Sequence, residues 1–125
     1  MAFIDIRTLD GAPLLVAADS VFRITLSTPV LAGGALTRID FGTEHQLTRT
    51  GPREIEQALT TLGVQFVELL APDGTTPIFL SVAAISAVRR AEPGQDPLGS
   101  NVAIMVQGQR QTVQQTLAEV RLLLA

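Results

Sequence analysis

The only histidine of the chain, His45, directly follows Glu44 and lies near Asp40. A histidine titrates close to neutral pH, so it can act as a general base or as a metal ligand. One histidine beside two acids lacks the ligand number and spacing of a zinc site, however. The three residues also flank Gly42, which marks a turn. Solvated turn residues are therefore the preferred interpretation, and Asp40, Glu44 and His45 form a weak polar-site candidate.

The densest basic point of the chain is the pair Arg89 and Arg90. Such a pair can bind an anion or a partner's carboxylate, and it can equally protect the end of an edge strand. No serine lies in a Gly-x-Ser-x-Gly elbow, and the Gly33-Gly34 loop is followed by a predicted strand instead of the helix that a phosphate cradle requires. We predict no catalytic, cofactor-binding or metal-ligating residue, and no enzyme activity.

Composition narrows the class of protein further. The chain has 125 residues, of which 46% are hydrophobic and 17% charged, as in a globular domain with an aliphatic core. The net charge of −3 argues against nucleic-acid binding, which depends on neutralising phosphates. There is no cysteine, no signal-peptide pattern and no apolar stretch approaching about 18 residues, the length of a membrane span. We predict a cytoplasmic protein of bacterial type that binds no membrane.

The chain repeats itself with an offset of 63 at the start that grows to 65 or 66 near the end. The residues that recur in the second half are Phe3, Asp10, Gly11, Pro13, Pro29, Gly42, Thr50, Glu54 and Leu59. A period of this length indicates two supersecondary units that bury their apolar faces against each other. We therefore predict a single domain, 1–125, made of two repeats, 1–63 and 64–125.

Each repeat reads as four strands and a helix. In the first, alternation and turn residues predict strands over 3–7, 13–27, 36–41 and 46–50, and a loop over 29–34. A kink at 18–20 divides the second of these strands into 13–17 and 21–27. A helix begins at Gly51-Pro52 and ends at Gly63. The second half predicts strands over 66–70, 77–80, 84–90, 102–106 and 111–115, then a helix that Thr116 and Glu119 begin as a capping box.

One strand does not match between the halves. If Gly42 is superposed on Gly108, the apolar residues before each glycine fall on opposite faces, and either a bulge or different burial would explain this. The predicted fold class is α+β, mostly β. The two tandem β-β-β-β-α repeats are expected to pack as a pseudo-twofold sandwich or barrel-like sheet with two helices, which cap its ends or one face.

This pattern resembles the short FlbD-type proteins of bacterial flagellar operons. The residues that carry the resemblance are Leu9-Asp10-Gly11, Pro13 to Val16, Val21, Ile24, Thr28-Pro29, Ile39 to Gly42 and Glu54-Ile55, and in the second half Asp73-Gly74, Pro77 to Leu80, Ile85, Val88, Gly108 and Glu119-Val120. The chain would hold two copies where the family has one. It has Asp-Gly in place of the family's Asn-Gly turn, and no lysine. The resemblance implies a small β-rich module without known catalysis.

The last helix carries the most suggestive surface. An apolar stripe of Leu117, Val120 and Leu124 faces a core, and Leu122 and Leu123 extend apolar character around the helix. These five residues are either a seat between the repeats or a subunit interface. We predict a non-enzymatic structural or protein-interaction module that forms a homo-oligomer, with a C2 dimer favoured, or binds another protein. The alternative is a small-ligand-binding protein or enzyme with a pocket at the repeat junction.

Overall fold

The computed structural model describes residues 2–26 and 36–125, so the predicted loop over 29–34 lies outside the described residues. The first half contains β1 (Phe3–Arg7), β2 (Pro13–Ala17), β3 (Val21–Leu26), β4 (Thr37–Phe41), β5 (Glu44–Thr48) and α1 (Pro52–Thr61). The second contains β6 (Phe66–Leu70), β7 (Pro77–Ser81), β8 (Ile85–Arg90), β9 (Val102–Val106), β10 (Gln109–Val113) and α2 (Leu117–Leu124). The same element order thus occurs twice, and the predicted α+β, mostly β class is confirmed.

Local sequence signals locate most element boundaries correctly. The predicted kink inside the second strand is a full break: a 3₁₀ turn, Ala18–Ser20, separates β2 from β3, and Val82–Ala84 separates β7 from β8. Each half therefore has five strands among the described residues, where four were predicted. Gly63 has a φ of 94° and follows α1, where the Val64 backbone N–H donates to the Leu59 carbonyl at 3.1 Å. Thr116 and Glu119 form the predicted capping box of α2. These signals involve residues close in sequence, so the element boundaries could be predicted without knowledge of the tertiary structure.

The mismatch around Gly42 comes from superposing the wrong residues. Gly42, with a φ of 56°, begins the two-residue turn after β4, and Gln107, with a φ of 49°, begins the corresponding turn after β9. Gly108 is the second residue of its turn, so superposing it on Gly42 shifts the strand by one position. With the turns aligned, Ile39 and Ile104 occupy the same position and both are fully buried. No bulge between the halves is needed.

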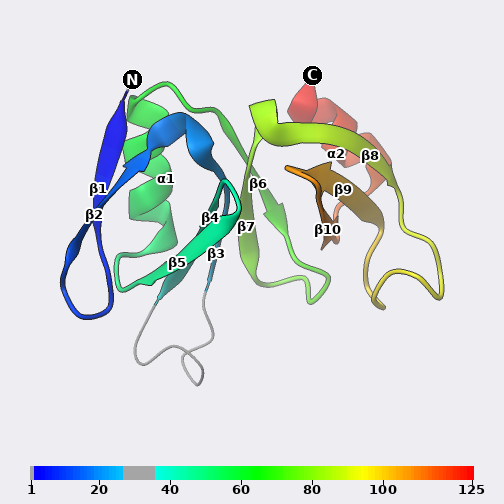
Figure 1. The fold of residues 1–125 in the computed structure, drawn as a ribbon. Coiled ribbons are helices and arrows are strands. Elements are labelled where there is room, and N and C mark those ends of the chain that lie inside the picture. Colours follow the sequence, from blue (N-terminus) through cyan, green and yellow to red (C-terminus); the bar gives the residue numbers. More distant parts are fainter. Residues whose placement is uncertain (1, 27–35) are drawn as a thin grey trace.

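Three open sheets form among the described residues (Figure 1). β1 and β2 make one sheet, and β8, β9 and β10 make another. Between them lies a five-stranded sheet of order β5-β4-β3-β7-β6, in which β3 of the first half pairs antiparallel with β7 of the second. The Cα partners across this junction are Arg23 and Leu80, Ile24 and Phe79, and Thr25 and Ile78.

This pairing between the halves is one-sided. A twofold axis that pairs β3 with β7 would also pair β8 with β2, because β8 and β2 are their counterparts. The only strand neighbour recorded for β2 is β1, and the only one recorded for β8 is β9, among residues 2–26 and 36–125. The predicted pseudo-twofold arrangement is therefore replaced by a head-to-tail contact, in which unlike surfaces of the two halves meet. That the sheets stack as a sandwich stays a prediction.

Two apolar clusters make the core, and the halves share them. Phe79 of β7 packs in the first cluster with Ile24, Ile55 and Leu59 of the first half. In return, Phe22 of β3 packs in the second cluster among residues of the second half. Both phenylalanines are 2% exposed. Mutual burial of this kind stabilises the junction through the apolar area that it removes from water.

Candidate functional site

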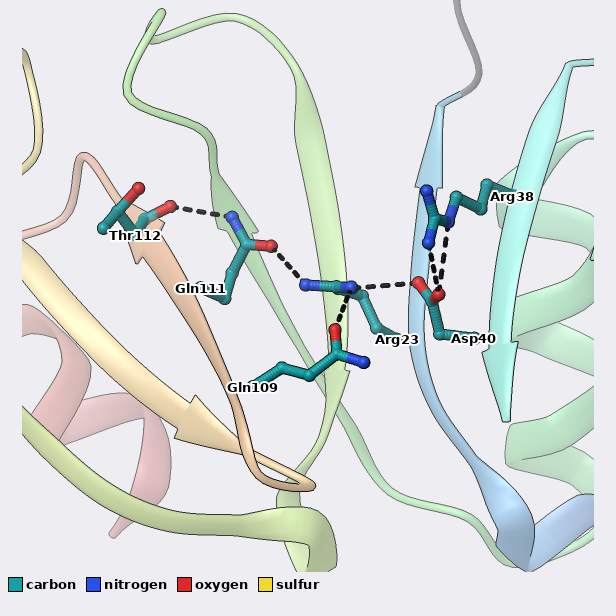
Figure 2. Close-up of polar contacts among 6 residues, drawn as sticks. All are labelled: Arg23, Arg38, Asp40, Gln109, Gln111 and Thr112. Atoms are coloured by element: carbon teal, nitrogen blue, oxygen red, sulfur yellow. Dashed lines mark hydrogen bonds and ion pairs between the residues drawn. The ribbon is translucent and has the colours of Figure 1, made fainter. Parts of the chain in front are cut away.

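A polar cluster spans the junction between the two halves (Figure 2). Arg23 of β3 binds Asp40 of the neighbouring β4, with 2.9 Å between Nε and Oδ2. The same guanidinium donates to the side-chain oxygens of Gln111 at 3.0 Å and Gln109 at 2.6 Å, both on β10 of the second half. Arg38 lies 3.1 Å from the other carboxylate oxygen of Asp40. Each of the three guanidinium nitrogens of Arg23 is therefore engaged within the chain.

The burial of this cluster indicates that it stabilises the fold. The Asp40 side chain is 2% exposed and that of Arg23 13%, so a charge left alone there would be costly. His45 lies opposite Asp40 in the register of β4 and β5, but it is exposed, and so is Glu44. The ion pairs recorded for Asp40 go to the two arginines instead. The three residues of the weak polar-site candidate therefore lie in β4 and β5 instead of in the predicted turn, and no side-chain hydrogen bond or ion pair joins them among the residues that the structure describes.

The two arginines of the predicted basic pair, Arg89 and Arg90, lie in different environments. Arg89 donates to Asp96 at 2.9 Å, and the Asp96 side chain is 1% exposed. The Arg89 hydrogen bond, with a second from the Glu92 backbone N–H, holds the pKa of Asp96 below its usual range. Arg90 is exposed and lines a groove beside α2. Arg89 therefore anchors the loop after β8, whereas Arg90 faces solvent.

The five apolar residues predicted on α2 also differ in their burial. Val120 is 1% exposed, and Leu117 and Leu124 pack against the second core cluster. Leu122 is 79% exposed and Leu123 48%. The first three form a seat within the chain, and the last two are free to contact a partner.

Two grooves adjoin this helix. One, of about 250 Å³, is lined by Val88, Leu117, Val120, Arg121, Leu124 and Ala125. The second, of about 500 Å³, is lined by Arg90, Leu117, Ala118, Arg121 and Leu122. The first has apolar walls from β8 and α2 and one arginine, Arg121, whereas the second joins apolar residues of α2 to Arg90 and Arg121. Together they suit an apolar side chain accompanied by an acidic one.

The other end of the molecule presents an apolar strand. Leu15 of β2 is 66% exposed, although its counterpart in β7, Phe79, is 2% exposed. The strands differ because β7 has β3 as a neighbour, whereas the outer edge of β2 has none among the described residues. Figure 1 shows the β1–β2 hairpin and the β8–β10 sheet on opposite sides of the five-stranded sheet.

Other kinds of site receive no support from the geometry. No group of three or more His, Asp or Glu side chains gathers as a metal site would require, within 2–26 and 36–125. In that same part of the chain, neither helix has the length and apolar character needed to cross a bilayer. No family model matches the chain, and searches of curated proteins and of solved structures find no significant match. The FlbD-type resemblance therefore rests on the quoted residues alone.

Sequence reasoning missed Arg23, Gln109, Gln111, Leu15 and Val88. An acid at the centre of an apolar strand, as in Ile39-Asp40-Phe41, indicates that the carboxylate has a charged or hydrogen-bonding partner. The residues close to it in sequence do not show that this partner is Arg23. Leu15 and Phe79 are each the third residue of their strands, and only strand pairing distinguishes them. The sequence does not indicate which strand edges pair, because that pairing joins residues distant in sequence.

Proposed function

We propose that this chain is a non-enzymatic structural module that self-associates. The observation that carries the proposal is apolar surface at both ends of the molecule, with Leu15 exposed on β2 and Leu122 and Leu123 exposed on α2. Exposed apolar groups gathered beside a groove are typical of interaction surfaces. The polar groups that the sequence offered for chemistry are either paired within the chain or isolated at the surface.

The proposal includes a tandem duplication. The two runs of elements, β1 to α1 and β6 to α2, share their order and nearly their lengths. Equivalent side chains even repeat a contact: Gln46 donates to the Leu47 carbonyl at 2.8 Å, and Gln111 donates to the Thr112 carbonyl at 2.9 Å. An ancestral unit that associated with copies of itself would place the same contact surfaces in both halves.

A small-ligand pocket at the junction of the halves has less support. The guanidinium of Arg23 is engaged by Asp40, Gln109 and Gln111. The two grooves beside α2 adjoin β8 instead of the junction.

Light scattering coupled to gel filtration tests the proposal at micromolar concentrations. We expect a mass above 13.3 kDa, the mass of one chain, that increases with protein concentration. A strict monomer throughout this range, combined with failure to capture a second tagged copy, would overturn self-association.

A further inference from the structure

We infer that copies of this chain join by edge-strand addition, with β8 of one copy pairing antiparallel with β2 of the next. This inference rests on the proposed self-association and specifies its surface. The product is a five-stranded sheet of order β10-β9-β8-β2-β1, in which the last two strands come from the second copy. It would reproduce the sheet β5-β4-β3-β7-β6 that already exists within one chain.

The junction inside the chain supplies the register. Phe79 is the third residue of β7 and Leu15 the third of β2, while Ile24 is the fourth of β3 and Val88 the fourth of β8. Within the chain, Ile24 and Phe79 are Cα partners. Val88 of one copy should therefore lie opposite Leu15 of the next. An exposed strand edge presents unpaired backbone groups, so addition of a strand satisfies them directly.

Burial points to the same two edges. Ile24 and Phe79, which already meet at the internal junction, are 0% and 2% exposed. Their counterparts are less buried, since Val88 is half-buried and Leu15 is 66% exposed. A position that is buried at the internal junction is expected to be more exposed at a strand edge that lacks a neighbouring strand.

The groove beside α2 fits the side chain that would enter it. In the first half, Phe79 packs against Ile24 of β3 and against Ile55 and Leu59 of α1. In the second half, the equivalent walls are Val88, Val120 and Leu124, which line the groove of about 250 Å³. Edge pairing would bring Leu15 of the neighbouring copy into this space, where its burial removes apolar surface from water.

Charge is complementary at the rim. Inside the chain, Glu68 of β6 lies 2.9 Å from Arg53, the second residue of α1. Their counterparts are Asp5, third in β1, and Ala118, second in α2. The groove lined by Ala118 also has Arg90 and Arg121 on its walls. The exposed Asp5 of the incoming copy would therefore approach two arginines, a pairing that favours the correct orientation.

The chain contains no cysteine, so a disulfide can report this contact. Residues directly opposite in antiparallel strands have Cα atoms about 4.5–5.5 Å apart, within the range of a disulfide. A mixture of Leu15→Cys and Val88→Cys chains should form a covalent heterodimer under mild oxidation. Leu15→Cys mixed with Leu98→Cys controls for chance collision, because Leu98 is 99% exposed in the loop after β8. Equal yields in the two mixtures would refute the register.

A second measurement does not depend on cysteine geometry. Leu15→Asp replaces the apolar side chain with a carboxylate among Val88, Val120 and Leu124. It should weaken association by about a hundredfold, because apolar burial is lost and desolvating a charge costs several kcal/mol even with Arg121 nearby. Leu98→Asp, the matched apolar-to-acid change, should leave association unchanged. Circular dichroism checks that both variants fold.

The outcomes separate the two proposals. If the chain associates, yet Leu15→Asp has no effect and the Leu15–Val88 disulfide does not form, edge pairing is wrong and self-association stands. A matched Leu122→Asp variant that alone abolishes association would assign the interface to α2 and likewise overturn edge pairing. If the unmodified chain is a monomer at every concentration, both proposals fail.

Discussion

Replacing Arg23 with methionine tests whether the buried cluster holds the two halves together. Methionine keeps much of the apolar stem, but it removes the ion pair to Asp40 and the hydrogen bonds to Gln109 and Gln111. Asp40, 2% exposed, would then keep Arg38 as its only ion-pair partner within the part of the chain that the structure describes, and that side chain is 43% exposed. Removing one partner of a buried pair costs about 3–5 kcal/mol. Because Arg38 still offsets part of the charge, we expect about 3 kcal/mol.

A double-mutant cycle isolates the pair itself. Asp40→Asn alone should cost about 2 kcal/mol, because Arg23 keeps both glutamine partners. The double variant, Arg23→Met with Asp40→Asn, should be about 2 kcal/mol more stable than the sum of the single changes predicts. The chain has no Trp or Tyr, so urea unfolding is best followed by far-ultraviolet circular dichroism.

The control is an ion pair at the surface. Arg53 and Glu68 also lie 2.9 Å apart, but their side chains are 59% and 45% exposed. Solvent screening limits such pairs, so Arg53→Met should lower the free energy of unfolding much less than Arg23→Met does. If Arg23→Met costs no more than Arg53→Met, burial does not strengthen the cluster and the reasoning fails.

Three further predictions concern single positions. Phe79→Ala empties a fully packed site and should lower the free energy of unfolding by about 3–5 kcal/mol in urea denaturation, and a loss below about 1 kcal/mol would contradict its role in joining the halves. Gly99→Ala should cost about 3 kcal/mol in the same assay, because φ is +87° and the new Cβ would lie 2.5 Å from the Pro72 carbonyl oxygen, whereas Gly94→Ala, with φ +86° and open space, should cost only about 1 kcal/mol. Hydrogen bonds from Thr76 and Thr75 lower the pKa of Asp73 from 3.8 to about 2, so its contribution to stability is present above about pH 4 and is lost as the pH falls toward 2; Asp73→Asn should therefore flatten the acid limb of a stability-versus-pH curve, and an unchanged limb would contradict the assignment.

Much of the fold could be predicted because its signals are local. The 3₁₀ kink after Ala17, the glycine at the end of α1 and the Thr116 capping box each involve residues within a few positions of one another. Strand alternation likewise reports which residues share a face. One local error, Gly42 superposed on Gly108, arose because Gln107 takes the positive-φ position that a glycine takes in the first half. The strands predicted over 46–50 and 111–115 also begin two residues earlier than expected, at Glu44 and Gln109.

The candidate site was predicted less completely. Leu122 and Leu123 were predicted to lie either in a seat between the repeats or in a subunit interface, and the structure leaves both exposed. The partner of Asp40 was not predicted, because Arg23 reaches it across neighbouring strands and Gln109 and Gln111 come from the other half of the chain. Side-chain contacts at such separations in sequence depend on which strands become neighbours, and residue types alone do not encode that choice.

The amino-acid sequence by itself determined the doubled order of strands and helices, their turns and caps, and the aliphatic character of the core. Only the tertiary structure decided that β3 pairs with β7 while β2 and β8 each keep an open edge among the described residues, and hence that Phe79 is buried where Leu15 is exposed. The physical reason is that strand edges join through backbone N–H and C=O groups, which are nearly the same at every residue. Which edge meets which is settled by the packing of the whole chain.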